Sequence, residues 1–376
     1  MRRGVALVLD GHGWAVRSVV TSLGADGWFV LAPRGTKSAR SRLCGAAVDI
    51  PDYTHDTAQF TARVRRILRE WNVRLVAPAE DGSLELLYET PGLLGDAAVL
   101  GGDRESALLA LDKPRTLKAA RAAGFRTPAF IEPQRVDEAV AAARDIGLPC
   151  VIKPTRSYAR AGSGMRSARL AWAYSPVEAR RHVEAFLAQG FAMPLVQEYV
   201  PGRSIGVAAV LRRGRVLGWG AREAFSQLPI RGGSAVWRAT VSGDEPGVQD
   251  ALALLRTLGF EGLGDVQYHI ARDGTPTLME IGARTYGWLP LTIAAGADLP
   301  AIAARATEGE EPAATVAARP GMHMRWLRGE LARLREAAAP RVQLPPGGRR
   351  TDVIRQLWPL TGRSMLYDGW GAARRA

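Results

Sequence analysis

The chain has 376 residues, of which 47% are hydrophobic and 23% charged, as in a folded globular protein long enough for two or three domains. Two cysteines argue against a disulfide framework, and no apolar run reaches the roughly 20 residues of a membrane span, so we expect a cytoplasmic protein. The formal net charge is +13. The basic residues that produce it are scattered singly or in pairs along the chain, which argues against a nucleic-acid site.

Strand-like apolar runs and stretches with helical spacing alternate along about the first 100 residues. The predicted strands are 5–10, 28–32 and 75–78, and the predicted helices are 15–23, 58–70 and 82–89. This alternation predicts an α/β domain with a parallel sheet. Gly11 and Gly13 match a dinucleotide fingerprint only in part, because the third glycine and the ribose-binding acid are missing.

A different pattern begins after Leu111. Asp112 and Pro114 are an N-cap acid and a first-turn proline, so they predict the start of a helix that ends at Gly124. The elements predicted beyond it are strands at 150–153, 194–200, 205–211 and 215–221, and helices at 175–189 and 324–337, the last followed by a loop at 340–350. This order predicts a mixed α+β domain.

Lysine is rare in this chain and therefore informative. Only four of the 50 basic residues are lysines, namely Lys37, Lys113, Lys118 and Lys153. Lys153 ends a predicted strand and is followed by Gly162-Ser163-Gly164. Glycine lets backbone N–H groups approach a phosphate, and a lysine beside such a loop adds charge, so a phosphate site is one interpretation and a flexible turn is the other.

Two alternating apolar runs within residues 264–284 flank Asp273-Gly274, a dipeptide typical of two-residue hairpin turns. Such a turn pairs Arg272 with Thr275 and, farther from the turn, predicts three cross-strand pairs on one face, namely His269 with Leu278, Gln267 with Glu280, and Asp265 with Gly282. The opposite face would then carry an apolar set that packs on a core, namely Val266, Tyr268, Ile270, Met279 and Ile281.

The predicted face gathers Asp265, Gln267 and Glu280, whose side chains start about 5 Å apart across the strands. Carboxylate and amide oxygens are the ligands that Mg²⁺ prefers, and Arg284 follows directly as a cation. A solvent-facing hairpin with scattered polar residues is the alternative. The packed opposite face favours the metal site.

Four segments carry a resemblance to a known family. They are LDKPRTLKAARAAGFRTP with Lys113, PCVIKP with Lys153, LVQEYVPG at 195–202 and LMEIGART at 278–285. In this order they resemble the ATP-grasp superfamily, nearest to the arm that holds the ATP-binding halves of carbamoyl phosphate synthetase and many carboxylate–amine ligases. The resemblance covers about residues 1–330.

The resemblance implies an ATP-dependent ligase that joins a small-molecule carboxylate, such as an amino acid, to an amine through an acyl-phosphate. ATP and Mg²⁺, or alternatively Mn²⁺, would be the cofactors. A homodimer is one assembly that the resemblance allows. The implied ATP-binding residues are Lys113, Lys153, Ser163, Gly164, Gln197, Glu198, Tyr199, Val200 and Ser204. The implied metal ligands are Gln267, Glu280 and Asp265, and the implied catalytic residues are Arg284, Lys153 and Arg238, with Arg222 and Arg231 as further candidates for the triphosphate or the substrate carboxylate.

The chain departs from the family pattern at two positions that bear on the site. Gly282 stands where the family has a metal-binding asparagine, and Asp265, opposite it, could reach into the vacated position. LVQEYVPG at 195–202 resembles the hinge segment that holds adenine in the family. No acid follows this hinge segment to bind ribose, and Ser204 could contact the sugar instead.

The resemblance also implies a domain order. A Rossmann-like pre-ATP-grasp domain would cover 1–110, a two-lobed ATP-grasp domain 111–310 with its lid lobe at about 125–200, and a small C-terminal extension 311–376. One rival reading is a degenerate nucleotide-binding module without ligase activity. Another is a basic nucleic-acid-binding protein, whose binding would weaken steeply with salt.

Overall fold

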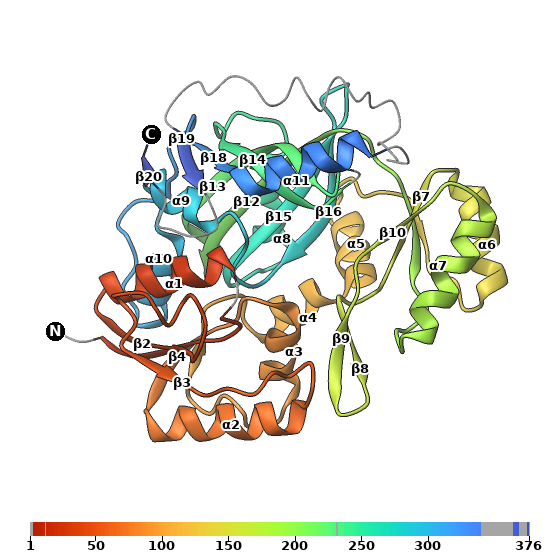
Figure 1. Ribbon diagram of the computed structural model, residues 1–376. Coiled ribbons are helices and arrows are strands. Elements are labelled where there is room, and N and C mark those ends of the chain that lie inside the picture. The colour runs from red at the N-terminus through yellow and green to blue at the C-terminus, as the bar shows by residue number, and fades with distance from the viewer. Residues whose placement is uncertain (1–2, 12, 231, 340–363, 368–373, 376) are drawn as a thin grey trace.

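The computed structural model describes residues 3–11, 13–230, 232–339, 364–367 and 374–375. Within these residues lie an N-terminal parallel sheet, a small antiparallel sheet, a large sheet and a separate hairpin (Figure 1). The mixed architecture of helices and sheets predicted from the sequence is confirmed. No helix in the described ranges is long and apolar enough to cross a membrane.

The N-terminal sheet has five parallel strands in the order β3-β2-β1-β4-β5. Its strands are β1 (Gly4–Val8), β2 (Trp28–Pro33), β3 (Ala46–Val48), β4 (Val73–Ala77) and β5 (Ala98–Val99), and its helices are α1 (Trp14–Ala25), α2 (Thr57–Glu70) and α3 (Asp81–Glu89). Alternate side chains of β1 point to opposite faces, so Ala6 and Val8 pack with α1, whereas Leu7 packs with α2 and α3. The predicted parallel arrangement is present.

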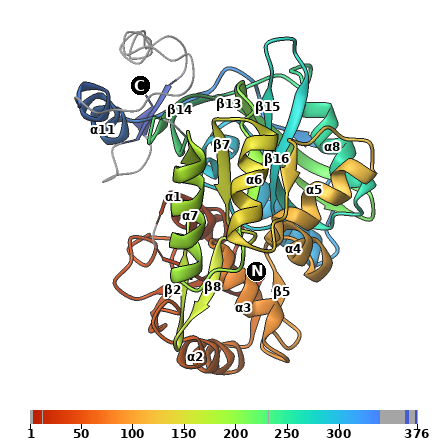
Figure 2. The same cartoon turned by 90° about the vertical axis from the view of Figure 1, so that its right-hand side faces the viewer.

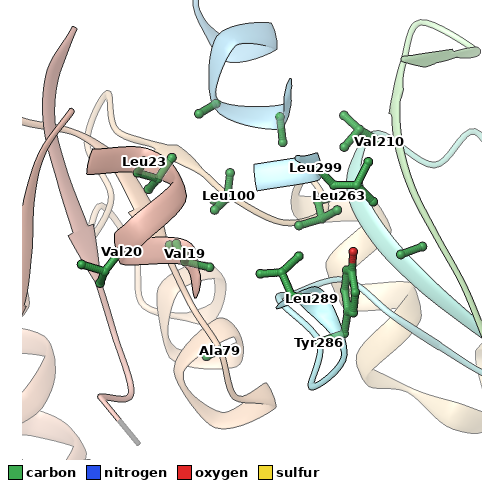
Figure 3. Close-up of a cluster of buried hydrophobic side chains, with 14 of the residues drawn as sticks. Val19, Val20, Leu23, Ala79, Leu100, Val210, Leu263, Tyr286, Leu289 and Leu299 are labelled. Carbon is green, nitrogen blue, oxygen red and sulfur yellow. The ribbon is translucent and has the colours of Figure 1, made fainter. Parts of the chain in front are cut away.

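Helix α1 joins this sheet to the rest of the molecule. Val19, Val20 and Leu23 of α1 share one core with Leu289 of α9 (Leu289–Ala294) and Leu299 of α10 (Leu299–Thr307) (Figure 3). Each such side chain contributes about 1.5–3 kcal/mol by leaving water. This shared core holds the carboxyl ends of β1 and β4 beside the large sheet.

The small sheet has the strand order β10-β7-β11-β6 with antiparallel pairs throughout. It consists of β6 (Phe130–Ile131), β7 (Cys150–Lys153), β10 (Ala171–Ala173) and β11 (Leu195–Glu198), covered by α6 (Val136–Ile146) and α7 (Pro176–Ala188). The two helices lie side by side on the outer face of this lobe (Figure 2). The predicted end of the lysine strand at Lys153 is correct.

The segment after Lys153 is not a flexible turn, which was one of the two interpretations of Gly162-Ser163-Gly164. It forms the hairpin β8 (Tyr158–Ala161) and β9 (Gly164–Ser167), which reaches toward the N-terminal helices (Figure 1). The Met165 amide donates to the Tyr53 carbonyl over 3.1 Å, and the Thr57 amide donates to the Ser163 carbonyl over 2.8 Å. Contacts across about 100 residues of sequence therefore order this segment.

The large sheet follows the order β16-β15-β12-β13-β14-β18-β19-β20, with β17 beside β13. Its strands are β12 (Arg203–Arg212), β13 (Arg215–Leu228), β14 (Ser234–Thr240), β15 (Gly262–Ile270), β16 (Pro276–Gly282), β17 (Val316–Ala317), β18 (His323–Trp326), β19 (Ser364–Tyr367) and β20 (Arg374–Arg375). One face carries α4 (Arg104–Leu111), α5 (Lys113–Ala122) and α8 (Val248–Thr257). Helix α11 (Leu327–Ala338) packs on β13 and β14. The loop predicted at 340–350 lies outside the described residues.

Candidate active site

A cleft of about 1490 Å³ lies where the three sheets meet. Residues from the N-terminal sheet, the small sheet and the large sheet all line it. The predicted site residues among them are Lys113, Lys153, Gln197, Glu198, Tyr199, Val200, Ser204, Gln267, Glu280 and Arg284. The fold therefore brings together residues that are up to 171 positions apart in the chain.

Two lysines face this cleft from different elements. Lys153, at the end of β7, is only 6% exposed, and its Nζ donates to the Met279 carbonyl over 3.3 Å and lies 3.6 Å from Oε2 of Glu280. Lys113 is the first residue of α5, which the Asp112 side chain caps as predicted. Its Nζ donates to Ser157 Oγ over 3.1 Å. Burial, together with repulsion from Lys153, lowers the pKa of Lys113 to about 8.

The β15–β16 hairpin pairs Gln267 with Glu280 and Asp265 with Gly282, as predicted. Nearer the turn the predicted register is wrong, because His269 pairs with Thr277 instead of Leu278. The turn has three residues, with the Gly274 amide donating to the Ala271 carbonyl and Gly274 at a φ of 84°.

A bulge in the β15–β16 ladder explains why the predicted pairs Gln267–Glu280 and Asp265–Gly282 are nevertheless correct. The register shifts between Gln267 and Tyr268, and this shift offsets the one-residue error at the turn. Leu278 therefore enters the buried core, whereas Met279 lines the cleft, which reverses the faces predicted for these two residues.

Asp265 does not line the cleft, although its strand position was predicted correctly. The side chain is 7% exposed, and its Oδ1 accepts a hydrogen bond from Trp288 Nε1 over 3.2 Å. Burial raises its pKa to about 6, partly offset by the nearby Arg222 guanidinium. Arg222 is itself buried and donates to the Ser204 carbonyl and to Ser204 Oγ, both over 3.1 Å. Asp265 thus forms part of a layer beneath the cleft.

We expect Asp265→Asn to leave ATP turnover within about tenfold of the unaltered protein, because the carboxylate lies beneath the cleft wall. The free energy of unfolding should fall by about 1–3 kcal/mol, since buried Arg222 would lose its nearby counter-charge. Denaturant melts and ADP assays measure both. A loss of turnover of a hundredfold or more, with unchanged stability, would instead support Asp265 as a metal ligand.

Arg284 connects the large sheet to the N-terminal sheet. Its Nε donates to Oδ1 of Asp81 over 2.6 Å. Burial opposes ionisation of Asp81, but the Arg284 charge, the hydrogen bond from Ser157 and the Lys113 charge together outweigh it, so the pKa of Asp81 is lowered. Asp10 and Glu80, which the sequence reasoning missed, line the same end of the cleft. Their places directly after two parallel strands were the available signal.

The hinge segment at 195–202, which begins with β11, combines buried polar groups with backbone. Gln197 is 1% exposed, and its Oε1 has no hydrogen-bond partner among the described residues. The Glu198 carboxylate accepts from the Ala129 amide over 2.9 Å. Nδ1 of His269 lies 2.7 Å from the Val200 carbonyl oxygen, and burial lowers the pKa of this histidine. His269 was missed as a site residue because the register assigned it no chemical role.

Several predicted residues lie away from the cleft. Ser163 and Gly164 dock on the N-terminal segment, where Ser163 Oγ donates to the His55 carbonyl over 2.8 Å. Arg238 is not among the cleft-lining residues, and its Nη2 donates to the Ala235 carbonyl. Arg231 lies outside the described residues. The phosphate contact predicted for the Gly-Ser-Gly turn is therefore replaced here by a contact with protein.

The described residues contain no group of three or more histidine, cysteine, aspartate or glutamate side chains that could hold a metal. Glu280 and Gln267 nevertheless place two hard oxygen donors side by side on the cleft wall. Mg²⁺ commonly takes only one or two protein carboxylates and fills its other positions with water and phosphate oxygens. The residues present thus fit Mg²⁺ bound together with a nucleotide.

Comparisons with known proteins agree with this geometry. Residues 191–330 match a family model described as "ATP-grasp in the biosynthetic pathway with Ter operon". A D-alanine–D-alanine ligase of Nitrosospira multiformis is 28% identical over 56% of this chain and 67% of the relative. The vancomycin/teicoplanin A-type resistance protein of Enterococcus faecium is 29% identical over 59% of this chain and 66% of the relative.

The match to the carbamoyl phosphate synthase large chain of Xylella fastidiosa, at 27% identity, covers 56% of this chain but only 20% of that protein. The chain thus spans about two thirds of the ligase relative and the resistance protein, and a fifth of the synthase. Among solved structures, biotin carboxylase of Campylobacter jejuni has a TM-score of 0.67 at 15% identity, covering 85% of this chain and 74% of that one.

An L-amino acid ligase of Bacillus licheniformis has a TM-score of 0.62 at 15% identity, covering 81% of this chain and 74% of that one. At such identities the solved structures show the fold alone. This fold agrees with the family model and with the curated relatives. The resemblance to the ATP-grasp superfamily that was inferred from the lysine, hinge and Glu280 segments is thereby confirmed.

Proposed function

We propose that the chain is an ATP-dependent ligase that joins a small-molecule carboxylate to an amine and releases ADP and phosphate. The observation that carries the proposal is the convergence of Lys113, Lys153, Gln267, Glu280 and Arg284 on one cleft. The relative named as a D-alanine–D-alanine ligase supports an ATP-dependent ligase of small molecules. Amino acids are therefore the first substrates to test.

In the proposed reaction a carboxylate oxygen attacks the γ-phosphorus of ATP, and ADP leaves. The amine then attacks the acyl carbon, phosphate departs with one carboxylate oxygen, and the amine loses a proton. Lys113 and Lys153 would hold the phosphates, and Arg284 would stabilise the charge that develops on the transferred group. Mg²⁺ held by Gln267 and Glu280 would neutralise phosphate charge.

We also propose the domain order implied by the family. The parallel sheet would belong to a pre-ATP-grasp domain at 1–110, and the small sheet to the lid lobe of an ATP-grasp domain at 111–310. Residues 311–376 would form an extension, since β18 and α11 add to the large sheet. In this domain order, the substrate would lie between the carboxyl ends of β1 and β4 and the wall formed by Glu280 and Arg284.

The β8–β9 hairpin would act as the lid that keeps water from the acyl-phosphate. We expect Gly164→Ala to lower the amount of amide formed per ADP several-fold, because a Cβ there would lie 2.0 Å from the Thr54 carbonyl oxygen and prevent docking. Gly162→Asn is the matched control, since Gly162 has open space and a φ of 60° that asparagine tolerates. An equal amount of amide per ADP in both variants would argue against a lid role for the hairpin.

A pH dependence follows from Lys113. Its pKa of about 8 means that the side chain loses its charge between pH 7 and pH 9, so ATP affinity should fall as pH rises, by up to about tenfold. Lys113→Arg should bind ATP with little change across the same range, because arginine stays protonated. Titration calorimetry at both pH values measures the effect. A flat profile for the unaltered protein would exclude a phosphate contact by Lys113.

The experiment that tests the proposal is an ATP-to-ADP assay across pools of amino acids and small carboxylates, with Glu280→Ala as the blank. We expect ADP formation that depends on a substrate pair. ATP binding without any substrate-dependent turnover would favour the degenerate nucleotide-binding module, which the replacement of the usual asparagine by Gly282 motivates. Formation of AMP would rule out the acyl-phosphate route.

A further inference from the structure

His269 occupies a position in the cleft to which the proposed reaction assigns no role. It lies on β15 directly opposite Ser204 on β12, and both side chains line the cleft. Its Nδ1 is 2.7 Å from the carbonyl oxygen of Val200, a residue of the hinge segment. The imidazole therefore bridges the hinge and the floor of the cleft.

The contact with Val200 determines which ring nitrogen carries the proton. A carbonyl oxygen can only accept a hydrogen bond, so Nδ1 must be the donor. In the neutral imidazole the other nitrogen, Nε2, is then an acceptor. No described residue contributes a hydrogen bond to Nε2, and the ring lines the cleft. A ligand at this point must therefore present a donor.

The position of His269 along the cleft indicates which part of a nucleotide it meets. Gln267, the proposed magnesium ligand, is two residues away on β15, about 7 Å along the strand. Gln197, with its unpartnered buried Oε1, and the Val200 backbone lie on the hinge side. Since the sugar lies between the base and the phosphates of a nucleotide, His269 lies at the level of the sugar.

Ser204 completes the arrangement. Its Oγ accepts from Arg222 Nη1 over 3.1 Å, which leaves its own hydroxyl hydrogen free to donate toward the cleft. The pair thus offers one acceptor and one donor on neighbouring strands, and a vicinal diol matches both. A phosphate oxygen has no proton to give and does not match the acceptor. The segment after the hinge also contains no acid that would serve this purpose.

We propose that His269 is a specificity-determining residue that accepts a hydrogen bond from a ribose hydroxyl of the nucleotide, with Ser204 donating beside it. The pair would select ribonucleotides over deoxyribonucleotides. This inference rests on the proposed function only in requiring that the cleft binds ATP. It needs no carboxylate or amine substrate.

The test compares the dissociation constants of ATP, 2′-deoxy-ATP and 3′-deoxy-ATP by titration calorimetry with the full-length protein and Mg²⁺. The unaltered protein should bind at least one deoxynucleotide about 5- to 30-fold more weakly than ATP, as expected for one lost hydrogen bond in a buried site. In His269→Leu this ratio should fall to about one, whereas all three affinities could weaken together through the lost Val200 contact.

His55→Leu is the control, because His55 is exposed on the N-terminal segment and lies outside the cleft, and it should keep the full ratio. Equal binding of all three nucleotides by the unaltered protein would overturn the inference, even if His269→Leu failed to fold. A ratio that survives in folded His269→Leu would also overturn it and leave the histidine a purely structural hinge contact. Tighter binding of ATP than of a deoxynucleotide, without any ADP formation, would contradict the proposed ligase activity but still support the role of His269.

Discussion

Glu280→Gln should lower substrate-dependent ADP formation by about 100- to 1000-fold. The side chain lines the cleft beside Gln267 and lies 3.6 Å from Lys153 Nζ, so its charge would hold both Mg²⁺ and the phosphate-binding lysine in place. Loss of one preorganised group at a site of developing charge has an effect of this size. Steady-state assays at saturating ATP measure it.

Stability should hardly change in Glu280→Gln, because the side chain is 42% exposed and an ion pair this accessible contributes about 0–1 kcal/mol. Glu223→Gln is the matched control. Glu223 is a partly buried glutamate on β13 that pairs with Arg203 over 2.9 Å and does not line the cleft. Similar activity in the two variants would contradict a metal-binding role for Glu280.

Lys153→Met should weaken ATP binding by about 100-fold, an effect of about 3 kcal/mol that matches the loss of a charge-assisted hydrogen bond in a shielded site. Lys153 is almost completely buried, and among the described residues its ammonium group makes its polar contacts with Glu280 and the Met279 carbonyl. Methionine keeps the apolar stem and removes the charge. Titration calorimetry with ATP and Mg²⁺ measures the change.

Lys118→Met is the control for Lys153→Met, since Lys118 is 61% exposed and pairs with Glu132 over 2.5 Å at the surface. It should bind ATP as the unaltered protein does. Lys153→Met should not unfold more easily, because it removes a buried charge whose desolvation opposes folding. ATP affinity within threefold of the unaltered protein would exclude Lys153 from the phosphate site.

The parts of the fold that the sequence predicted well are those encoded by neighbouring residues. The start of α5 follows from Asp112 and Pro114, which cap and begin the helix through contacts within one turn. The end of β7 at Lys153 follows from the proline after it. Such local preferences need no knowledge of the distant chain.

The opposition of Gln267 and Glu280 was predicted correctly, although the turn of the hairpin was predicted wrongly. Gln267 and Glu280 are opposite each other because a three-residue turn and a bulge offset one another. Alternation of apolar residues could not reveal the bulge, because Leu278 and Met279 are both apolar and either could face the core. The cleft-facing role of Met279 follows only from the structure.

The residues that could not be predicted depend on contacts between distant segments. The docking of Gly164 on Thr54 joins the β8–β9 hairpin to the N-terminal segment, and no local signal encodes it. The same holds for His269, whose contact with Val200 crosses from β15 to the hinge. Asp265 was placed on the correct strand face, but its partner Trp288 lies in a loop that sequence periodicity does not position.

The most direct test of the proposed reaction follows an oxygen atom. Once the ADP assay has identified a substrate pair, the carboxylate substrate is supplied with ¹⁸O in both carboxyl oxygens, and the phosphate released is examined by mass spectrometry. The acyl-phosphate route predicts that each phosphate carries one ¹⁸O atom, because the carboxylate oxygen that attacks the γ-phosphorus leaves with it. Unlabelled phosphate, formed together with the amide, would contradict the account.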